Sequence, residues 1–179
     1  MHGRKFHHVS GIMNTTLALG HAASGKSNWA ETEIMQLDGR AVYVATARVL
    51  DGEMRAKVEL HATRRGAEWS LIEEALDLPG VCADRRRGEV VLIDCATMWL
   101  TNLMLDGMSW EEPTEAWISA MKSSPAHFIV VSNDVGGGIT PDNAMARQFQ
   151  RDQGALNQRL AAALDRVVLV TAGMPQRLK

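Results

Sequence analysis

The chain has 179 residues, of which 46% are hydrophobic and 22% charged, and these values are typical of one globular domain with a substantial core. Its formal net charge of −2 does not favour non-specific binding to nucleic acid, and no apolar run is long enough to cross a bilayer. The polar, histidine-bearing N-terminus has no apolar stretch of the kind found in signal peptides. Cys82 and Cys95 lack metal-ligand or redox spacing, so we expect two reduced, buried thiols in a cytoplasmic protein.

Taken in chain order, residues 1–12 are predicted to be a tail and residues 13–179 a single domain. Short apolar runs predict strands covered on both faces at residues 16–19, 41–46, 90–95, 127–132 and 167–171. The segments between them predict helices at residues 26–37, 51–64, 69–76, 98–105, 112–122 and 141–164, the last broken near Gly154. This alternation predicts an α/β fold with a mainly parallel sheet and helices on both of its faces.

The first predicted strand runs into the sequence G-H-A-A-S-G-K-S at residues 20–27, which matches the phosphate-binding loop G-x-x-x-x-G-K-[S/T]. Gly20 and Gly25 let the backbone turn tightly and bring its N–H groups close to phosphate oxygens. Lys26 supplies a positive charge for the β- and γ-phosphates, and the Ser27 hydroxyl is a ligand for Mg²⁺. A glycine-rich turn with a stray lysine is the alternative, but the strand, loop and helix context favours a P-loop NTPase that binds a nucleoside triphosphate.

Other polar residues follow the predicted strands, at the sheet edge where ligands bind in such folds. Asp94 ends the run at residues 90–94, where we expect it to hold Mg²⁺, although capping the next helix is an alternative. Residues 133–138 read N-D-V-G-G-G, which fits either a backbone that approaches a ligand or a flexible turn.

His61 lies on a predicted helix one turn before Arg64 and Arg65. A lone histidine is usually structural or exposed to solvent. Here, guanidinium groups that pair with phosphate would stand beside an imidazole that can attack phosphorus, so His61 is a candidate nucleophile.

Sequence blocks along nearly the whole chain after residue 13 match one known family. They are LALGHAASGKS (17–27), YVATARVLDGEM (43–54), His61, residues 66–69, Glu73, LIDCATMWLTN (92–102), VSNDVGGGITP (131–141) and residues 146–161, which include LNQRLA. In these blocks the chain resembles the bifunctional adenosylcobinamide kinase / adenosylcobinamide-phosphate guanylyltransferase of cobalamin biosynthesis. The phosphate loop is shared with many kinases. Far more specific are the block at 43–54, the helix with His61, the block at 92–102 and the NQRLA segment.

The resemblance implies a RecA-like P-loop fold, a homotrimer and two reactions. A nucleoside triphosphate, ATP or GTP, phosphorylates adenosylcobinamide, and GTP then transfers GMP through a histidine to give adenosylcobinamide-GDP. His61 matches the guanylylated histidine, and Lys26 is assigned to catalysis with it. The implied nucleotide-binding residues are Gly20, His21, Ala22, Ala23, Ser24, Gly25, Lys26, Ser27, Ala45, Thr46, Ala47, Ala62, Thr63, Arg64, Arg65, Glu73 and Asp94, with Ser27 and Asp94 holding Mg²⁺.

The chain departs from the usual family loop G-G-A-R-S-G-K-S at two positions, where His21 replaces a glycine and Ala23 replaces the arginine. Backbone contacts and Lys26 are retained, so we expect nucleotide binding to persist. Two alternatives remain open at this point. One is a P-loop small-molecule kinase without guanylyl transfer, and the other is a non-catalytic nucleotide-binding regulator.

Overall fold

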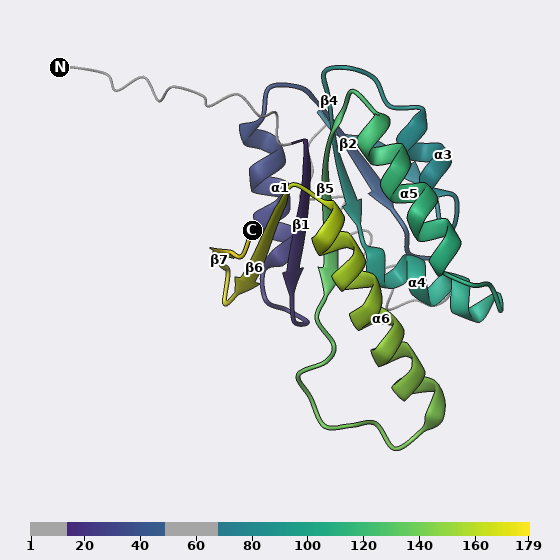
Figure 1. Cartoon of the computed structure of the whole chain (residues 1–179). Coiled ribbons are helices and arrows are strands. Elements are labelled where there is room, and N and C mark those ends of the chain that lie inside the picture. Colours follow the sequence, from purple (N-terminus) through teal and green to yellow (C-terminus); the bar gives the residue numbers. More distant parts are fainter. Residues whose placement is uncertain (1–13, 49–67) are drawn as a thin grey trace.

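The computed structural model describes residues 14–48 and 68–179. Its centre is a seven-stranded sheet with the order β3-β2-β4-β5-β1-β6-β7 (Figure 1). The strands are β1 Thr15–Gly20, β2 Arg40–Ala45, β3 Ser70–Glu73, β4 Glu89–Asp94, β5 His127–Asn133, β6 Arg166–Thr171 and β7 Met174–Arg177. Neighbouring strands are parallel except β6 and β7, which are antiparallel. The parallel sheet and its five expected strands are therefore confirmed.

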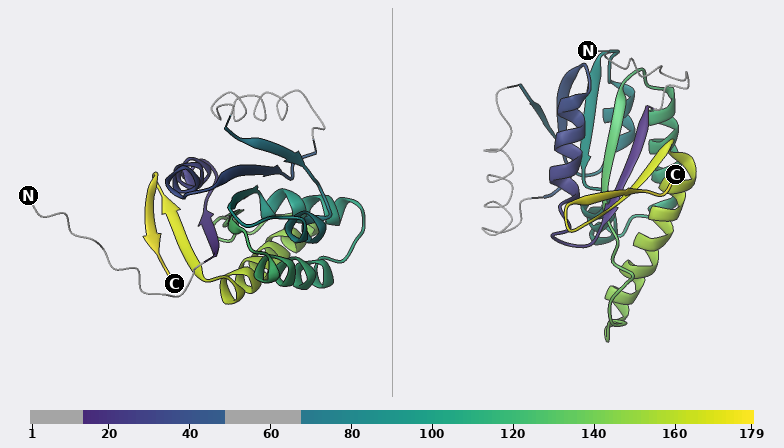
Figure 2. Two further views of the ribbon diagram at one scale, coloured as in Figure 1. Left: turned by 90° about the horizontal axis from the view of Figure 1, so that it is seen from above. Right: turned by 90° about the vertical axis from the view of Figure 1, so that its left-hand side faces the viewer.

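Helices cover both faces of the sheet, as predicted. They are α1 Lys26–Gln36, α3 Leu78–Ala83, α4 Ala96–Leu105, α5 Glu111–Ser123 and α6 Ala144–Ala163. Viewed from above, α1 lies on one face, and α3, α4, α5 and α6 lie on the other (Figure 2). None of these helices, in the ranges that the structure describes, is both long and apolar enough to span a membrane.

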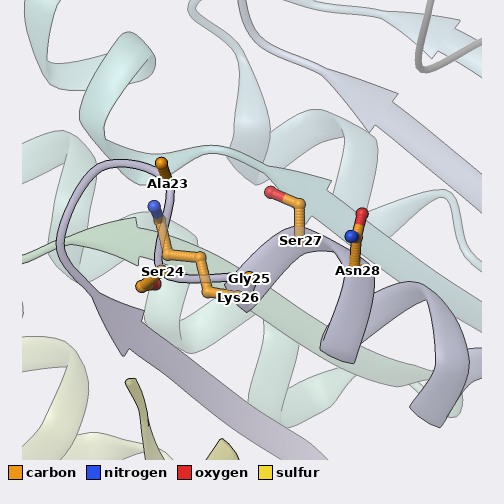
Figure 3. A pocket seen from close by; sticks show the side chains of 6 residues that line it. All are labelled: Ala23, Ser24, Gly25, Lys26, Ser27 and Asn28. Atoms are coloured by element: carbon orange, nitrogen blue, oxygen red, sulfur yellow. The ribbon is translucent and has the colours of Figure 1, made fainter. Parts of the chain in front are cut away.

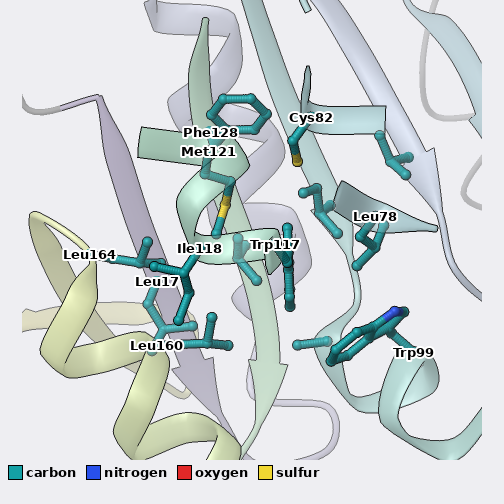
Figure 4. Close-up of a cluster of buried hydrophobic side chains, with 14 of the residues drawn as sticks. Leu17, Leu78, Cys82, Trp99, Trp117, Ile118, Met121, Phe128, Leu160 and Leu164 are labelled. Carbon is teal, nitrogen blue, oxygen red and sulfur yellow. The ribbon is translucent and has the colours of Figure 1, made fainter. Parts of the chain in front are cut away.

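Alternation along the strands divides the buried side chains into two cores. The larger core lies under the four helices and includes Leu17, Phe128 and the pair Trp99 and Trp117, whose rings are tilted by 55° with their centroids 5.0 Å apart (Figure 4). The smaller core lies under α1 and is made of the side chains that alternate with the first set, such as Ala18 on β1 and Leu92 on β4. Both faces of the central strands are thus apolar, which explains their continuous hydrophobic sequences.

Polar side chains fix the start of the first strand. Asp165, just before β6, accepts hydrogen bonds through Oδ2 from the backbone N–H groups of Asn14 and Thr15, both at 3.0 Å, and from Thr15 Oγ1 at 2.8 Å. Thr15 Oγ1 in turn accepts a hydrogen bond from the Asp165 N–H at 3.0 Å. These contacts set where β1 begins and therefore where the loop that follows it emerges.

The buried carboxylate of Glu89 anchors the start of β4. Burial alone would raise the pKa of Glu89, but it is lowered because the Arg86 N–H donates to the carboxylate at 2.8 Å and the guanidinium groups of Arg40 and Arg85 pair with it. The charged form is therefore the one that the fold stabilises.

The helix expected at residues 69–76 is wrong, because residues 70–73 form strand β3, parallel to β2. Composition does not separate a short helix from a strand in so few residues. The strand forms because residues 70–73 can pair with the edge of β2. Ile72 then packs onto the larger core, while Leu71 stays 55% exposed.

Other differences concern the C-terminal half and a helix that follows β3. Helix α6 continues through Gly154, so the expected break is absent. Helix α3 was not expected, and it begins where Asp77 accepts a hydrogen bond from the Gly80 N–H. Strand β7 was not expected either. It follows β6 after a two-residue turn in which Ala172 and Gly173 have φ angles of 52° and 77°, the backbone that a tight hairpin needs.

The remaining helices at residues 26–36, 96–105 and 111–123 agree with prediction, and both cysteines are buried and unpaired as expected. The expected tail at residues 1–12, the helix at 51–64 and the residues His61, Ala62, Thr63, Arg64 and Arg65 lie outside the described ranges.

Candidate nucleotide-binding site

The loop between β1 and α1 is held in shape by its two glycines. A Cβ on Gly20 would lie 2.4 Å from Ser24 Oγ and 2.6 Å from the Val170 carbonyl oxygen, so a side chain has no room there. Gly25 has a φ of 90°, and a Cβ on it would lie 2.9 Å from the Cα of Gly173 in the β6–β7 turn. The Gly173 N–H also donates to the Ser24 carbonyl at 2.7 Å. The C-terminal hairpin therefore packs directly against the loop.

A pocket of about 260 Å³ opens at this loop and is lined by Ala23, Ser24, Gly25, Lys26, Ser27 and Asn28 (Figure 3). Helix α1 starts here at Lys26 with no side-chain cap on its first turn. Free N–H groups and the positive end of the helix dipole make such a start a binding site for anions. The expected residues 23–27 are thus brought together in one cavity.

Lys26 is only 8% exposed, and its Nζ donates to the His21 carbonyl oxygen at 3.1 Å. Burial lowers the pKa of Lys26, whereas the nearby Asp94 carboxylate acts in the opposite direction and favours the charged amine. The loop therefore wraps around an amine that donates to a backbone carbonyl. A phosphate would offer this amine a charged partner in place of the carbonyl.

Asp94 ends β4 on the α1 side of the sheet and accepts a hydrogen bond from the Tyr43 hydroxyl at 3.0 Å. Burial raises the pKa of the next residue, Cys95, to about 12, so its thiol is neutral beside this carboxylate at neutral pH. No thiolate charge therefore lies beside the Asp94 side chain.

The expected residues on β2 and β3 meet Asp94 at the carboxyl edge of the sheet. Ala45 pairs with Asp94 on one side and with Glu73 on the other. Tyr43 and Ala45 belong to the core under α1, so the register places Glu73 and Asp94 on that same face. Glu73 is exposed at the end of its strand, while Asp94 is half-buried.

Thr46 follows β2 and is completely buried. Its hydroxyl accepts from the Cys95 N–H at 2.7 Å and donates to the Cys95 carbonyl at 2.8 Å, so it joins the ends of β2 and β4. A nucleotide contact of Ala45, Thr46 or Ala47 stays a prediction, and in Thr46 the hydroxyl is already committed to Cys95.

His21 connects the phosphate loop to the glycine-rich segment after β5. Its Nδ1 lies 2.8 Å from the Asp134 carbonyl oxygen, and a Cβ on Gly137 would lie 3.3 Å from the imidazole Cε1. A carbonyl only accepts hydrogen bonds, so Nδ1 is the protonated nitrogen. The histidine that departs from the family pattern thus packs against a glycine of the 133–138 segment.

Sequence reasoning gave no role to two residues near the site, Asn102 and Gly173. Asn102 is buried in α4, and its Nδ2 donates to the carbonyls of Thr46 at 2.7 Å and Ala75 at 3.0 Å, which ties the segments after β2 and β3 together. A lone amide within the apolar run M-W-L-T-N-L-M was the available signal. Gly173 had no comparable signal, because its role depends on a hairpin that folds back from the C-terminus.

The fold can be compared with solved structures. The crystal structure of the flagellar accessory protein FlaH from Methanocaldococcus jannaschii aligns over 93% of this chain and 78% of the FlaH chain, with a TM-score of 0.51. At 10% sequence identity this likeness concerns the fold alone. Together with the phosphate loop after β1, it places the chain in the class of P-loop NTPases with a RecA-like sheet.

Sequence comparison then gives the family. Residues 16–178 match the family described as cobinamide kinase / cobinamide phosphate guanyltransferase, and the chain belongs to it. The bifunctional adenosylcobalamin biosynthesis protein CobP of Pseudomonas aeruginosa is 37% identical over 166 residues, which cover 91% of this chain and 96% of that protein. The bifunctional adenosylcobalamin biosynthesis protein CobU of Escherichia coli K12 is 36% identical over 179 residues, which cover 91% of this chain and 98% of that protein.

Proposed function

We propose that this protein phosphorylates adenosylcobinamide with ATP or GTP and then converts the product to adenosylcobinamide-GDP with a second GTP. The observation that carries the proposal is the match to the kinase and guanyltransferase family over residues 16–178. The phosphate loop, its buried lysine and the carboxylate of Asp94 supply the site that such chemistry requires.

In the kinase step, the substrate hydroxyl attacks the γ-phosphorus, and the bond to the β–γ bridging oxygen breaks. The hydroxyl proton passes to water, and a nucleoside diphosphate leaves. Backbone N–H groups of residues 20–27 and the start of α1 hold the phosphates, and Lys26 neutralises charge on the β- and γ-oxygens. Positioning and electrostatics carry most of the acceleration in reactions of this type.

In the second step, His61 is the proposed carrier. Its imidazole nitrogen attacks the α-phosphorus of GTP, the bond to the β-phosphate breaks, and pyrophosphate leaves. An oxygen of adenosylcobinamide phosphate then attacks the same phosphorus and breaks its bond to nitrogen. Ala62, Thr63, Arg64 and Arg65 are proposed to contact the guanine nucleotide with His61, and so are residues 45–47 and Glu73 at the carboxyl edge of the sheet. Transfer of GMP through a histidine intermediate replaces one displacement by two easier ones.

Mg²⁺ fits the oxygen donors at this site. The Ser27 hydroxyl lines the phosphate pocket, and the Asp94 carboxylate lies close enough to Lys26 to act on its pKa. Mg²⁺ prefers such hard oxygen ligands and usually takes few from the protein, the rest coming from phosphates and water. When bound, it would neutralise charge on the phosphate oxygens. We propose Ser27 and Asp94 as its ligands.

The assembly and location belong to the same proposal. By resemblance to its family, we propose a homotrimer that works in the cytoplasm, where nucleoside triphosphates are made and used. Its substrates are then nucleotides and a corrinoid, and the net charge of −2 gives no reason to expect nucleic acid among its partners.

The test is a two-stage product assay with adenosylcobinamide, Mg²⁺ and GTP labelled on its α-phosphate. We expect adenosylcobinamide phosphate, then adenosylcobinamide-GDP, and an acid-labile label on the denatured protein. Phosphorylated product without protein label would leave only a kinase. Nucleotide binding without any turnover would indicate the non-catalytic regulator.

Two substitutions assign the steps. Lys26→Ala should weaken triphosphate binding strongly and slow both reactions, and unchanged GTP affinity would contradict the phosphate site. His61→Ala should abolish both the protein label and the formation of adenosylcobinamide-GDP, while phosphorylation of adenosylcobinamide continues. Normal amounts of adenosylcobinamide-GDP from His61→Ala would refute the histidine carrier.

A further inference from the structure

One strand lies between the phosphate loop and the Asp94 strand. In the sheet order, β5 separates β1 from β4, so β5 ends between the two halves of the nucleotide site. Its last residue, Asn133, pairs with Gly20, the first residue of the phosphate loop. On the other side, Asp94 pairs with Val131, two residues earlier on the same strand. With parallel strands about 4.8 Å apart, Asn133 lies beside Gly20 and two residues beyond the position opposite Asp94.

The register also gives the face on which the Asn133 side chain lies. Along β5, Phe128 and Val130 belong to the core under the four helices, whereas Ile129 and Val131 belong to the core under α1. Alternation therefore places Asn133 on the α1 side. The same rule places Asp94 there, and α1 begins with Lys26. The side chain of Asn133 thus lies on the face that carries the lysine and the carboxylate.

The backbone of Asn133 is fixed from three directions. Its N–H donates to Thr97 Oγ1 at 2.9 Å, its carbonyl accepts from Asn157 Nδ2 at 2.9 Å, and the following N–H, that of Asp134, donates to the Gly20 carbonyl at 3.0 Å. Asn157 is itself held, since its Oδ1 accepts from Ser132 Oγ at 2.6 Å. These contacts fix the direction in which the Asn133 side chain leaves the backbone.

The side-chain amide of Asn133, in contrast, has no hydrogen-bond partner among residues 14–48 and 68–179. It is half-buried at the end of β5, and it does not cap a helix, since α4 and α6 have Cys95 and Asn143 at their N-caps. The groups that hold the backbone here, Thr97 Oγ1, Asn157 Nδ2 and the Gly20 carbonyl, bond to backbone atoms and not to this amide. An amide that extends from a fixed backbone beside an anion site, with its donors unused, is suited to a ligand oxygen.

We propose that Nδ2 of Asn133 donates a hydrogen bond to a γ-phosphoryl oxygen of the bound triphosphate. The loop amides hold the α- and β-phosphates and Lys26 reaches the β- and γ-phosphates, so the γ-phosphoryl group extends toward the neighbouring strand ends. Asn133 ends the strand between the loop and Asp94, and its amide can bind the oxygens of the group that is transferred. This inference rests on the proposed nucleotide site.

The test measures the dissociation constants of GTP and GDP, each with Mg²⁺, by calorimetry on the full chain. Asn133→Ala should reduce the preference for GTP over GDP by about ten- to hundredfold, because only GTP has the γ-phosphoryl oxygens, and a hydrogen bond to a charged oxygen is of that strength. The kcat for phosphorylation of adenosylcobinamide should fall by about 10²-fold. Asn133→Asp keeps the size of the side chain, and its negative charge should reduce the preference further.

Gln158→Ala is the control, since it removes an exposed amide from α6, away from the loop. We expect wild-type affinities for both nucleotides and a wild-type melting temperature. If Asn133→Ala does not fold, Asn133→Asp decides the question. A GTP to GDP preference within twofold of wild type in the folded variants would overturn the proposal, whether both affinities fall together or neither changes. Because the readout needs no cobinamide, it separates this inference from the proposed function, which fails if the wild-type protein forms no phosphorylated corrinoid.

Discussion

Replacing Gly25 by alanine tests whether the C-terminal hairpin shapes the phosphate loop. Alanine in the left-handed region costs about 1–2 kcal/mol, and Gly25 has a φ of 90°. Its Cβ would also lie 2.9 Å from the Cα of Gly173, a backbone atom, so either the loop or the turn must move. Overpacking of this kind costs about 1–3 kcal/mol more. The free energy of unfolding should therefore fall by about 2–5 kcal/mol in Gly25→Ala.

Gly173→Ala is the matched control. Its φ of 77° imposes a similar left-handed penalty, but a Cβ there meets nothing within 4 Å. We expect a loss of about 1–2 kcal/mol and GTP affinity within threefold of wild type. Gly25→Ala should weaken GTP binding at least about tenfold, because displaced amides no longer point at the phosphates.

The assays are thermal unfolding and calorimetric titration with GTP and Mg²⁺. For a chain of this length, 1 kcal/mol corresponds to about 2–4 °C in Tm. Equal Tm and equal GTP affinity in the two variants would refute the reasoning, because the close approach of Gly25 to the hairpin would then have no consequence beyond its backbone angle.

Three further predictions concern stability and thiol chemistry. Gly154→Ala should raise the free energy of unfolding by about 1 kcal/mol, since Gly154 lies inside α6 and a Cβ meets nothing within 4 Å; a lower Tm would contradict this. The pKa of Glu89 is lowered in the folded state. Its contribution to the free energy of unfolding is therefore present above its ordinary pKa and is lost as the pH falls through the folded-state pKa. Glu89→Gln should therefore lower Tm at pH 7, and the two melting curves should converge as the pH falls below about 4; a constant difference would count against the ion pairs. Burial raises the pKa of both Cys82 and Cys95 to about 12, so at pH 8 neither should react with a thiol reagent until the protein unfolds, as mass spectrometry would show.

The central sheet was predictable because its strands are buried on both faces. Runs such as residues 90–93, V-V-L-I, carry no polar residue that would fit an amphipathic helix, and turn signals bound them. The edges were less predictable. Strand β3 has only four residues with one apolar side chain exposed, and β7 has no buried residue, so pairing with a neighbour rather than composition decides both.

The same distinction applies to the site. The phosphate loop is local in sequence, so its pattern identified Lys26 and Ser27, and the position after a strand identified Asp94. Contacts between distant segments were not visible. The hydrogen bond from Asn102 to residues after two different strands requires the register of the sheet, and so does the placement of Asn133 beside Gly20. The position of His61 relative to the loop stays a prediction.

The contact between Gly173 and Ser24 has a consequence for the synthesis of the protein on the ribosome. A ribosome makes residues 20–27 well before residues 172–173, which form the turn that braces them. A nascent or prematurely terminated chain would thus carry the complete phosphate motif without its support. Nucleotide should be unable to rescue such fragments from degradation, and tight GTP retention would report that synthesis had reached the hairpin.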